Sequence, residues 1–206
     1  KLCQKFPGEY WRARDKAREY PSEFVAALGE AGYLAALIPE EFGGAGLPIS
    51  AAAAILEEIQ AQGCNGGAVH AQMYIMGTML RHGSDAQKAQ YLPKIATGEL
   101  RLQAFGVTEP TSGTDTLALK TVAKRDGDDY VVNGQKLWTS RAEHSDLMLL
   151  LARTTPRDQV AKRTDGLSVF LVDMNAARDN GLTIRPIETM MNHSTTELVF
   201  DNMRVP

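Results

Sequence analysis

Several residue types and patterns that mark particular functional classes are scarce in this sequence. Its two cysteines, Cys3 and Cys64, lie in no CxxC motif, and its four histidines are scattered without an HExxH pattern. We therefore predict no metal site. Two isolated cysteines fit free thiols in a reducing compartment, which favours the cytoplasm, with the mitochondrial matrix as the alternative.

Long apolar runs and an excess of positive charge are also missing. No apolar run approaches the roughly 20 residues that a membrane-spanning helix needs, so no transmembrane segment is predicted. The 22 Lys and Arg residues against 25 Asp and Glu residues give a net charge of −3, which argues against nucleic-acid binding. With 206 residues, 44% of them hydrophobic, the chain can form one large or two small cores.

The hydrophobic pattern changes period near residue 100. Before it, apolar residues recur at helical spacing, and Ser22, Ser50 and Ser84 stand where N-caps are expected, for helices over 23–31, 51–62 and 85–97. We predict an α+β multidomain chain, with an all-α helical domain over 1–100 and an antiparallel β-barrel or sandwich domain over 101–206.

The second half contains short strands separated by turns. Asp126 to Asp129 and the pair Asn133-Gly134 each give a hairpin signal, so the segments on either side of both are expected to be separate strands. Helices followed by strands, without βαβ alternation, argue against a Rossmann domain. A bound dinucleotide therefore needs another mode of binding.

A methionine-rich stripe marks the helix predicted over 68–82. Val69, Met73, Met76 and Leu80 recur at spacings of three and four residues. Packing in the helical core is the favoured interpretation. The alternative is that Met73 and Met76 line an acyl pocket, because methionine adapts to irregular apolar shapes.

The stretch from Gly106 to Ala118 is rich in hydrogen-bond donors. Pro110 and Gly113 prevent regular structure, and the loop offers backbone N–H groups and Ser and Thr hydroxyls to a phosphate or a heteroaromatic edge. The order of Thr108, Glu109, Ser112, Gly113, Thr114 and Asp115 resembles the signature of the acyl-CoA dehydrogenase family.

A second segment supports the same resemblance. Lys136, Trp138 and Ser140 are similar to the family's second flavin segment. The resemblance implies FAD as cofactor, with Trp138 against the isoalloxazine, Thr139 and Ser140 at its edge, and Ser140 near N5. By the same resemblance, the pyrimidine side of the flavin contacts Phe105, Val107 and Thr108. The pyrophosphate contacts Gly113 and Thr114, and Thr114 also contacts the thioester substrate.

The family resemblance implies dehydrogenation of an acyl-CoA thioester to a trans-2-enoyl-CoA. It also implies an electron-transfer flavoprotein as partner and a homodimer or homotetramer. The catalytic Glu of this family lies in a C-terminal helical domain that is expected but absent from this chain, so no catalytic residue is assigned here, and Glu109 is interpreted as structural. The alternatives are an acyl-CoA oxidase, a flavin-dependent monooxygenase of the same superfamily, or a non-catalytic acyl-CoA-binding scaffold.

One segment departs from the pattern common in this family. Many members have an Arg shortly before a Ser where this chain has Asn192-His193-Ser194. The form found here resembles a different branch of the family, and it leaves the acyl specificity open.

Overall fold

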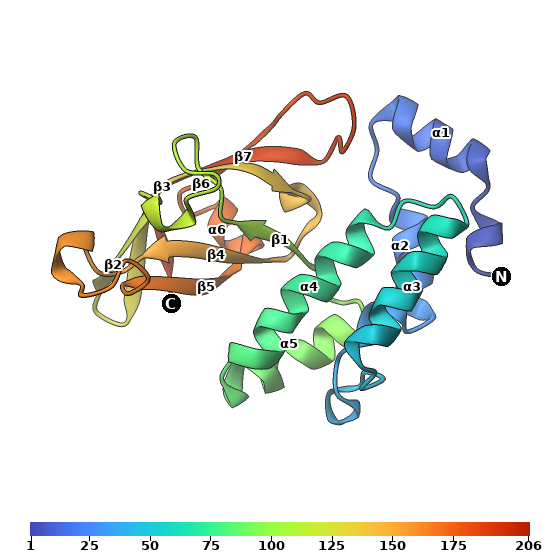
Figure 1. The fold of residues 1–206 in the computed structure, drawn as a ribbon, viewed down its shortest axis with the longest axis horizontal. Coiled ribbons are helices and arrows are strands. Elements are labelled where there is room, and N and C mark those ends of the chain that lie inside the picture. The colour runs from blue at the N-terminus through green and yellow to red at the C-terminus, as the bar shows by residue number, and fades with distance from the viewer. The chain divides into compact units, whose positions relative to one another are not determined.

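The computed structural model describes all 206 residues, which form two compact units, Lys1–Gln103 and Ala104–Pro206 (Figure 1). The first unit is built from helices and the second from a curled mixed sheet, which confirms the predicted fold class of a helical domain followed by a β domain. None of the helices is both long enough and apolar enough to span a membrane.

Five α-helices make up the first unit. They are α1 (Gly8–Ala17), α2 (Ser22–Glu30), α3 (Ile49–Ala61), α4 (Gly67–His82) and α5 (Asp85–Ala96), with short 3-10 turns at Cys3–Lys5, Tyr33–Ala35 and Glu40–Phe42. Their apolar faces bury one core, in which Phe24 is fully buried and contacts Phe6 and Trp11 edge to face. Packing of amphipathic faces therefore stabilises this unit.

Only one of the three predicted serine caps has its side chain in place. Ser84 accepts from the Gln87 backbone N–H while the Gln87 side chain accepts from the Ser84 backbone, a complete capping box. The other two predictions were wrong, because the N-cap positions of α2 and α3 are taken by Pro21 and Pro48, without a side-chain cap. Both helices begin at or before the predicted serine.

Seven strands form the second unit. They are β1 (Leu102–Gly106), β2 (Val122–Asp126), β3 (Asp129–Ser140), β4 (Leu147–Arg153), β5 (Leu167–Asp173), β6 (Leu182–Pro186) and β7 (Thr195–Val205), with the short helix α6 at Met174–Arg178. The strand order is β1-β4-β2-β3-β7-β6, with β5 paired to β4. The β2–β3, β3–β7, β4–β5 and β6–β7 ladders are antiparallel, whereas β2 meets β4 in parallel at Val122 and Arg153.

The hairpin predicted at Asn133-Gly134 is wrong, whereas the one at Asp126–Asp129 is confirmed by the β2–β3 pairing. Residues 129–140 are one strand, because the long β7 pairs along almost all of it. Gly134 lies in this strand at φ 148°, beside a shift in the β3–β7 register. The glycine therefore allows an irregularity within a strand and does not end it.

Candidate functional site

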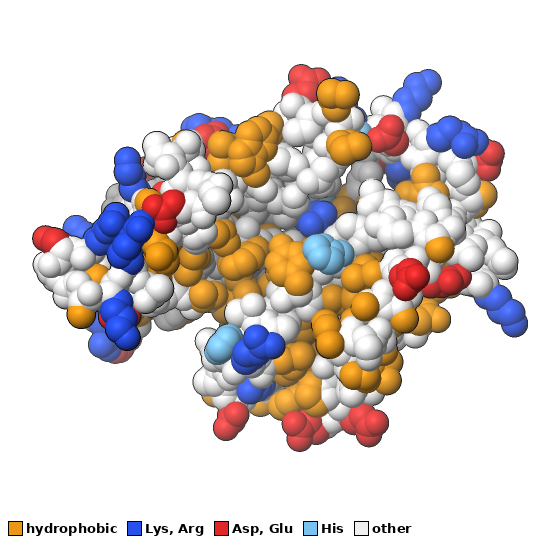
Figure 2. Space-filling view, in the orientation of Figure 1, with side chains coloured by type: hydrophobic (Ala, Val, Ile, Leu, Met, Phe, Trp, Pro, Cys, Tyr) orange, Lys and Arg blue, Asp and Glu red, His pale blue; other side chains and the backbone are white.

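The donor-rich loop leaves the sheet at the end of β1 and makes a tight turn. The Glu109 N–H donates to the Ser112 carbonyl at 2.9 Å and the Ser112 N–H donates to the Glu109 carbonyl at 3.1 Å. Gly113 and Thr114 follow this turn and are exposed. Asp115 is paired with Arg163 of the β4–β5 connection at 2.7 Å, at an end of the β unit where Figure 2 shows Lys and Arg side chains gathered.

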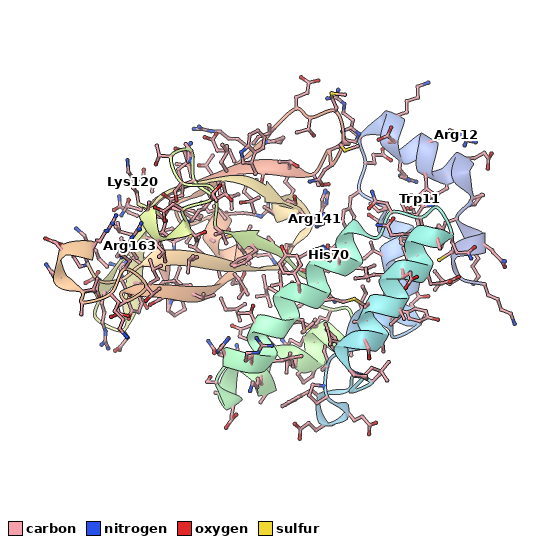
Figure 3. The ribbon with its side chains drawn as sticks, viewed as in Figure 1. Trp11, Arg12, His70, Lys120, Arg141 and Arg163 are labelled. Atoms are coloured by element: carbon pink, nitrogen blue, oxygen red, sulfur yellow. The ribbon has the colours of Figure 1, made fainter.

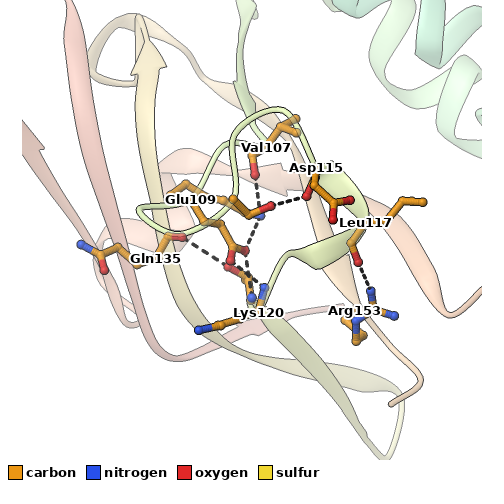
Figure 4. A network of polar contacts seen from close by, with 10 residues as sticks. Val107, Glu109, Asp115, Leu117, Lys120, Gln135 and Arg153 are labelled. Atoms are coloured by element: carbon orange, nitrogen blue, oxygen red, sulfur yellow. Dashed lines mark hydrogen bonds and ion pairs between the residues drawn. The ribbon is translucent and has the colours of Figure 1, made fainter. Parts of the chain in front are cut away.

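Glu109 does not face solvent. Its carboxylate accepts from the Lys120 N–H at 2.6 Å, the Thr121 N–H at 2.9 Å and the Lys136 ammonium at 2.9 Å (Figure 4). Both charged side chains are buried, with exposed fractions of 4% for Glu109 and 0% for Lys136. Glu109 is thus fully occupied by structural contacts, in agreement with its predicted structural role and not with that of a free base.

The stability of the β unit should depend on the ionisation of Glu109. Burial raises the pKa of Glu109, but hydrogen bonds from Thr121, Lys120 and Lys136 outweigh it, so this pKa lies below its usual value. The ionised carboxylate therefore contributes stability that is present above the unfolded pKa of about 4.3 and is lost as the pH falls through the lower folded pKa. We expect acid to destabilise the wild type more steeply than Glu109→Gln. Urea unfolding at a series of pH values measures this, and parallel pH profiles would contradict it.

The two segments predicted to hold the flavin lie side by side in the structure. The Leu137 N–H donates to the Thr108 carbonyl at 2.8 Å, and the Lys136 ammonium donates to the Val107 carbonyl at 3.0 Å. These contacts join the start of the loop to the stretch of β3 that carries Trp138. Two stretches 29 positions apart in the sequence are thus joined by two hydrogen bonds.

Trp138 occupies a bulge that turns its indole outward. Between Lys136 and Thr139 the strand has two residues, Leu137 and Trp138, where β7 has only Glu197. Trp138 takes φ 61°, a left-handed conformation rare for a bulky residue, and its exposed fraction is 56%. Strained backbone and an exposed aromatic are both uncommon in a strand, and their coincidence marks a candidate functional site.

Ser140 and Thr139, the next two predicted residues, differ in exposure. Ser140 ends β3 half-buried, and its Oγ accepts from the Asn192 side chain at 2.9 Å. Thr139 is 2% exposed, and its Oγ1 is buried without a hydrogen-bond partner. The flavin contact of Thr139 stays a prediction.

The remaining predicted site residues fall into two groups. Phe105, Val107 and Thr108 are half-buried in β1 and the start of the loop, on the same unit as Trp138. Met73 and Met76 are buried in the helical unit, with exposed fractions of 4% and 1%. Their burial agrees with the core-packing interpretation, and the acyl-pocket role stays a prediction.

Three residues near the site had no role assigned from the sequence. Lys136 is the buried partner of Glu109, and Arg178 of α6 donates to the Ala142 and Glu143 carbonyls at 3.2 Å each, just beyond β3. Asn192 contacts Ser140 from the β6–β7 connection. The spacing of Lys136 before Trp138 was a signal for Lys136. Nothing in the neighbouring sequence pointed to the contacts of Arg178 and Asn192.

The chemistry of this surface suits a planar heteroaromatic ligand. An exposed indole offers a face for stacking, and the Ser140 hydroxyl beside it offers a hydrogen bond to a ring edge. A side chain at Gly113 would meet no atom within 4 Å, so the space above the loop is open for a polar tail. The residues present therefore fit a flavin nucleotide.

Comparisons with known proteins agree on one family. Residues 1–99 match the N-terminal domain of acyl-CoA dehydrogenases, and residues 104–203 match their middle domain. The acyl-CoA dehydrogenase FadE26 of Mycobacterium tuberculosis is 37% identical over 184 residues, covering 89% of this chain and 45% of that protein. A glutaryl-CoA dehydrogenase of Desulfococcus multivorans is 35% identical over 200 residues, covering 93% and 49%.

A solved structure gives the same result. The acyl-CoA dehydrogenase of Geobacillus kaustophilus superimposes with a TM-score of 0.87 at 31% identity, covering 100% of this chain and 53% of that one. The chain thus spans about half the length of the relatives it matches. Its signature loop, its Trp138 segment and both matched domains place the chain in the acyl-CoA dehydrogenase family.

Proposed function

We propose that this chain forms the N-terminal domain (1–100) and middle domain (101–206) of an FAD-dependent acyl-CoA dehydrogenase. The reaction is removal of the α and β hydrogens of an acyl-CoA thioester to give a trans-2-enoyl-CoA, with electrons passed to an electron-transfer flavoprotein. The observation that carries the proposal is the juxtaposition of Thr108 with Leu137, which brings the signature loop beside the outward-turned Trp138.

The residues of the β unit have distinct parts in this proposal. Trp138 packs against the ring system of FAD, Ser140 donates to its edge, and Val107 and Thr108 contact its pyrimidine side. Gly113 and Thr114 hold the pyrophosphate, and Thr114 also contacts the thioester. FAD, when bound, accepts the two electrons taken from the substrate.

A carboxylate base must remove the α-proton, and Glu109 and Glu197 are both engaged in other contacts. Glu109 is buried against Lys136, and Glu197 is bound by Arg185 at 3.4 Å and by the Gln135 side chain. We propose that the base comes from the family's third, C-terminal helical domain, and that the enzyme is a homodimer or homotetramer.

Anaerobic visible spectroscopy of the FAD-loaded enzyme, with the proposed C-terminal domain included, tests the proposal. Bleaching of the flavin band by a member of a panel of acyl-CoA thioesters supports dehydrogenation. A flavin band that no thioester bleaches contradicts it, and a protein that cannot be reconstituted with FAD contradicts the flavin enzyme altogether. Rapid reoxidation of the bleached protein by oxygen would point to an acyl-CoA oxidase instead.

Removing the Trp138 indole should weaken FAD binding. Aromatic stacking is worth about 1–3 kcal/mol, so Trp138→Ala is expected to raise the dissociation constant of FAD by about 5- to 150-fold, whereas Trp138→Phe keeps most of the affinity. Titration of apoprotein with FAD measures this. Val169→Ala, which removes another exposed apolar side chain of the same unit, is the control. Equal affinities of wild type and Trp138→Ala would remove Trp138 from the site.

A further inference from the structure

The β6–β7 connection contacts the end of β3 at two adjacent points. The Asn192 side-chain amide donates to the Ser140 Oγ at 2.9 Å, and the Arg141 N–H donates to the Ser194 carbonyl at 2.7 Å. Arg141, labelled in Figure 3, follows directly on the strand. The β6–β7 connection therefore touches the hydroxyl proposed to meet the flavin edge.

Asn192 is itself held in place by its own backbone. Its carbonyl accepts from the Thr195 hydroxyl at 2.7 Å, the Thr195 N–H at 3.1 Å and the Thr189 hydroxyl at 3.3 Å. Its φ of 56° is a left-handed value that asparagine tolerates better than most residues. Three hydrogen bonds on one carbonyl fix the position from which the side-chain amide donates.

The direction of the Asn192 hydrogen bond determines what Ser140 can do. A serine hydroxyl has one proton and two lone pairs. When a lone pair accepts from the Asn192 amide, the hydroxyl proton is not used and remains available to a further acceptor. A serine hydroxyl without a hydrogen-bond partner can rotate, so it can either donate to a ligand or accept from it. The Asn192 amide, by donating to the oxygen, favours the orientation in which the hydroxyl donates.

We infer that Asn192 is a positioning residue that holds the Ser140 hydroxyl as a donor toward the polar edge of the flavin. This inference rests on the proposed function, and Asn192 acts only through Ser140. The short Asn192 side chain places its amide directly beside the hydroxyl, within hydrogen-bond distance of its oxygen.

The charge variant Asn192→Asp tests the inference most sharply. A carboxylate is close in shape to the amide but can only accept, so the Ser140 hydroxyl should donate its hydrogen bond to it and leave the flavin without a donor. We expect Asn192→Asp and Ser140→Ala each to raise the dissociation constant of FAD about 2- to 10-fold, the worth of one hydrogen bond. The double variant should be no weaker than either single one.

A second readout separates positioning from a purely structural role. The flavin midpoint potential, measured by dye equilibration, should shift by the same sign and a similar size in Asn192→Asp and Ser140→Ala. Asn175→Ala, which removes an exposed asparagine of the same unit, is the matched control and should leave both quantities unchanged. If Asn192→Asp does not fold, Asn192→Ala replaces it in the same double-variant cycle.

The outcomes distinguish this inference from the proposed function. Wild-type protein that binds FAD and is bleached by a thioester, while Asn192→Asp matches it in affinity and potential, overturns the role of Asn192 alone. Additive effects of the Asn192 and Ser140 changes overturn it as well. Wild-type protein that binds no FAD overturns the proposed function and this inference together.

Discussion

Glu109→Gln is expected to lower the free energy of unfolding of the β unit by about 3–5 kcal/mol. The change leaves the fully buried Lys136 ammonium without its counter-ion, and an unpaired buried charge is among the costliest defects in a protein. Burial already lowers the pKa of Lys136, against the opposing effect of Glu109. Without Glu109, nothing charged offsets that burial.

Urea unfolding followed by the fluorescence of one indole measures this loss. The chain has two tryptophans, Trp11 in the helical unit and Trp138 in the β unit, so a Trp11→Phe background reports the β unit alone. Adding Lys136→Met to Glu109→Gln should restore part of the stability, because both charges are then removed. Asp115→Asn, which breaks an exposed ion pair, should change it by about 0–1 kcal/mol. An unfolding midpoint of Glu109→Gln equal to that of the wild type would show that the buried pair is not needed.

Gly134→Ala should destabilise the same unit by about 2–5 kcal/mol. At φ 148° an alanine is strained, and its Cβ would lie 2.6 Å from the Thr121 Oγ1 and 2.7 Å from the Thr121 Cα. Thr121 also donates its N–H to Glu109, so a shift of Thr121 disturbs the buried ion pair as well. Gly134→Ala and Glu109→Gln therefore both act on Thr121.

The same fluorescence measurement in the Trp11→Phe background tests this expectation. Gly113→Ala is the matched control, because its Cβ would meet no atom within 4 Å and its backbone is not left-handed. A Gly134→Ala variant as stable as Gly113→Ala would mean that β3 can shift away from Thr121 at little cost.

Features set by neighbouring residues were predicted well from the sequence. The change from helical to strand period near residue 100 gave the fold class, and Ser84 with Gln87 forms the predicted cap. The signature loop and the Trp138 segment were found from residue order alone. In each case the determining residues lie within a few positions of one another.

Features set by distant partners were missed. Asn133-Gly134 has the composition of a hairpin turn, but pairing with β7 keeps the strand continuous through it. The outward turn of Trp138 comes from a mismatch in residue number between two strands more than 50 positions apart. The burial of Lys136 and the contact of Asn192 with Ser140 likewise arise only when the sheet closes.

Glu109 holds the two ends of the signature loop together through its side chain. Its carboxylate accepts from the backbone N–H groups of Lys120 and Thr121. The stretch 110–119 is therefore closed by one side chain, and not by pairing between two strands. Loop-closure entropy grows slowly with length, about 0.6 kcal/mol per doubling, so residues could be inserted between these points at small cost. The strands on either side should therefore keep their register when residues are inserted into the exposed tip of this loop.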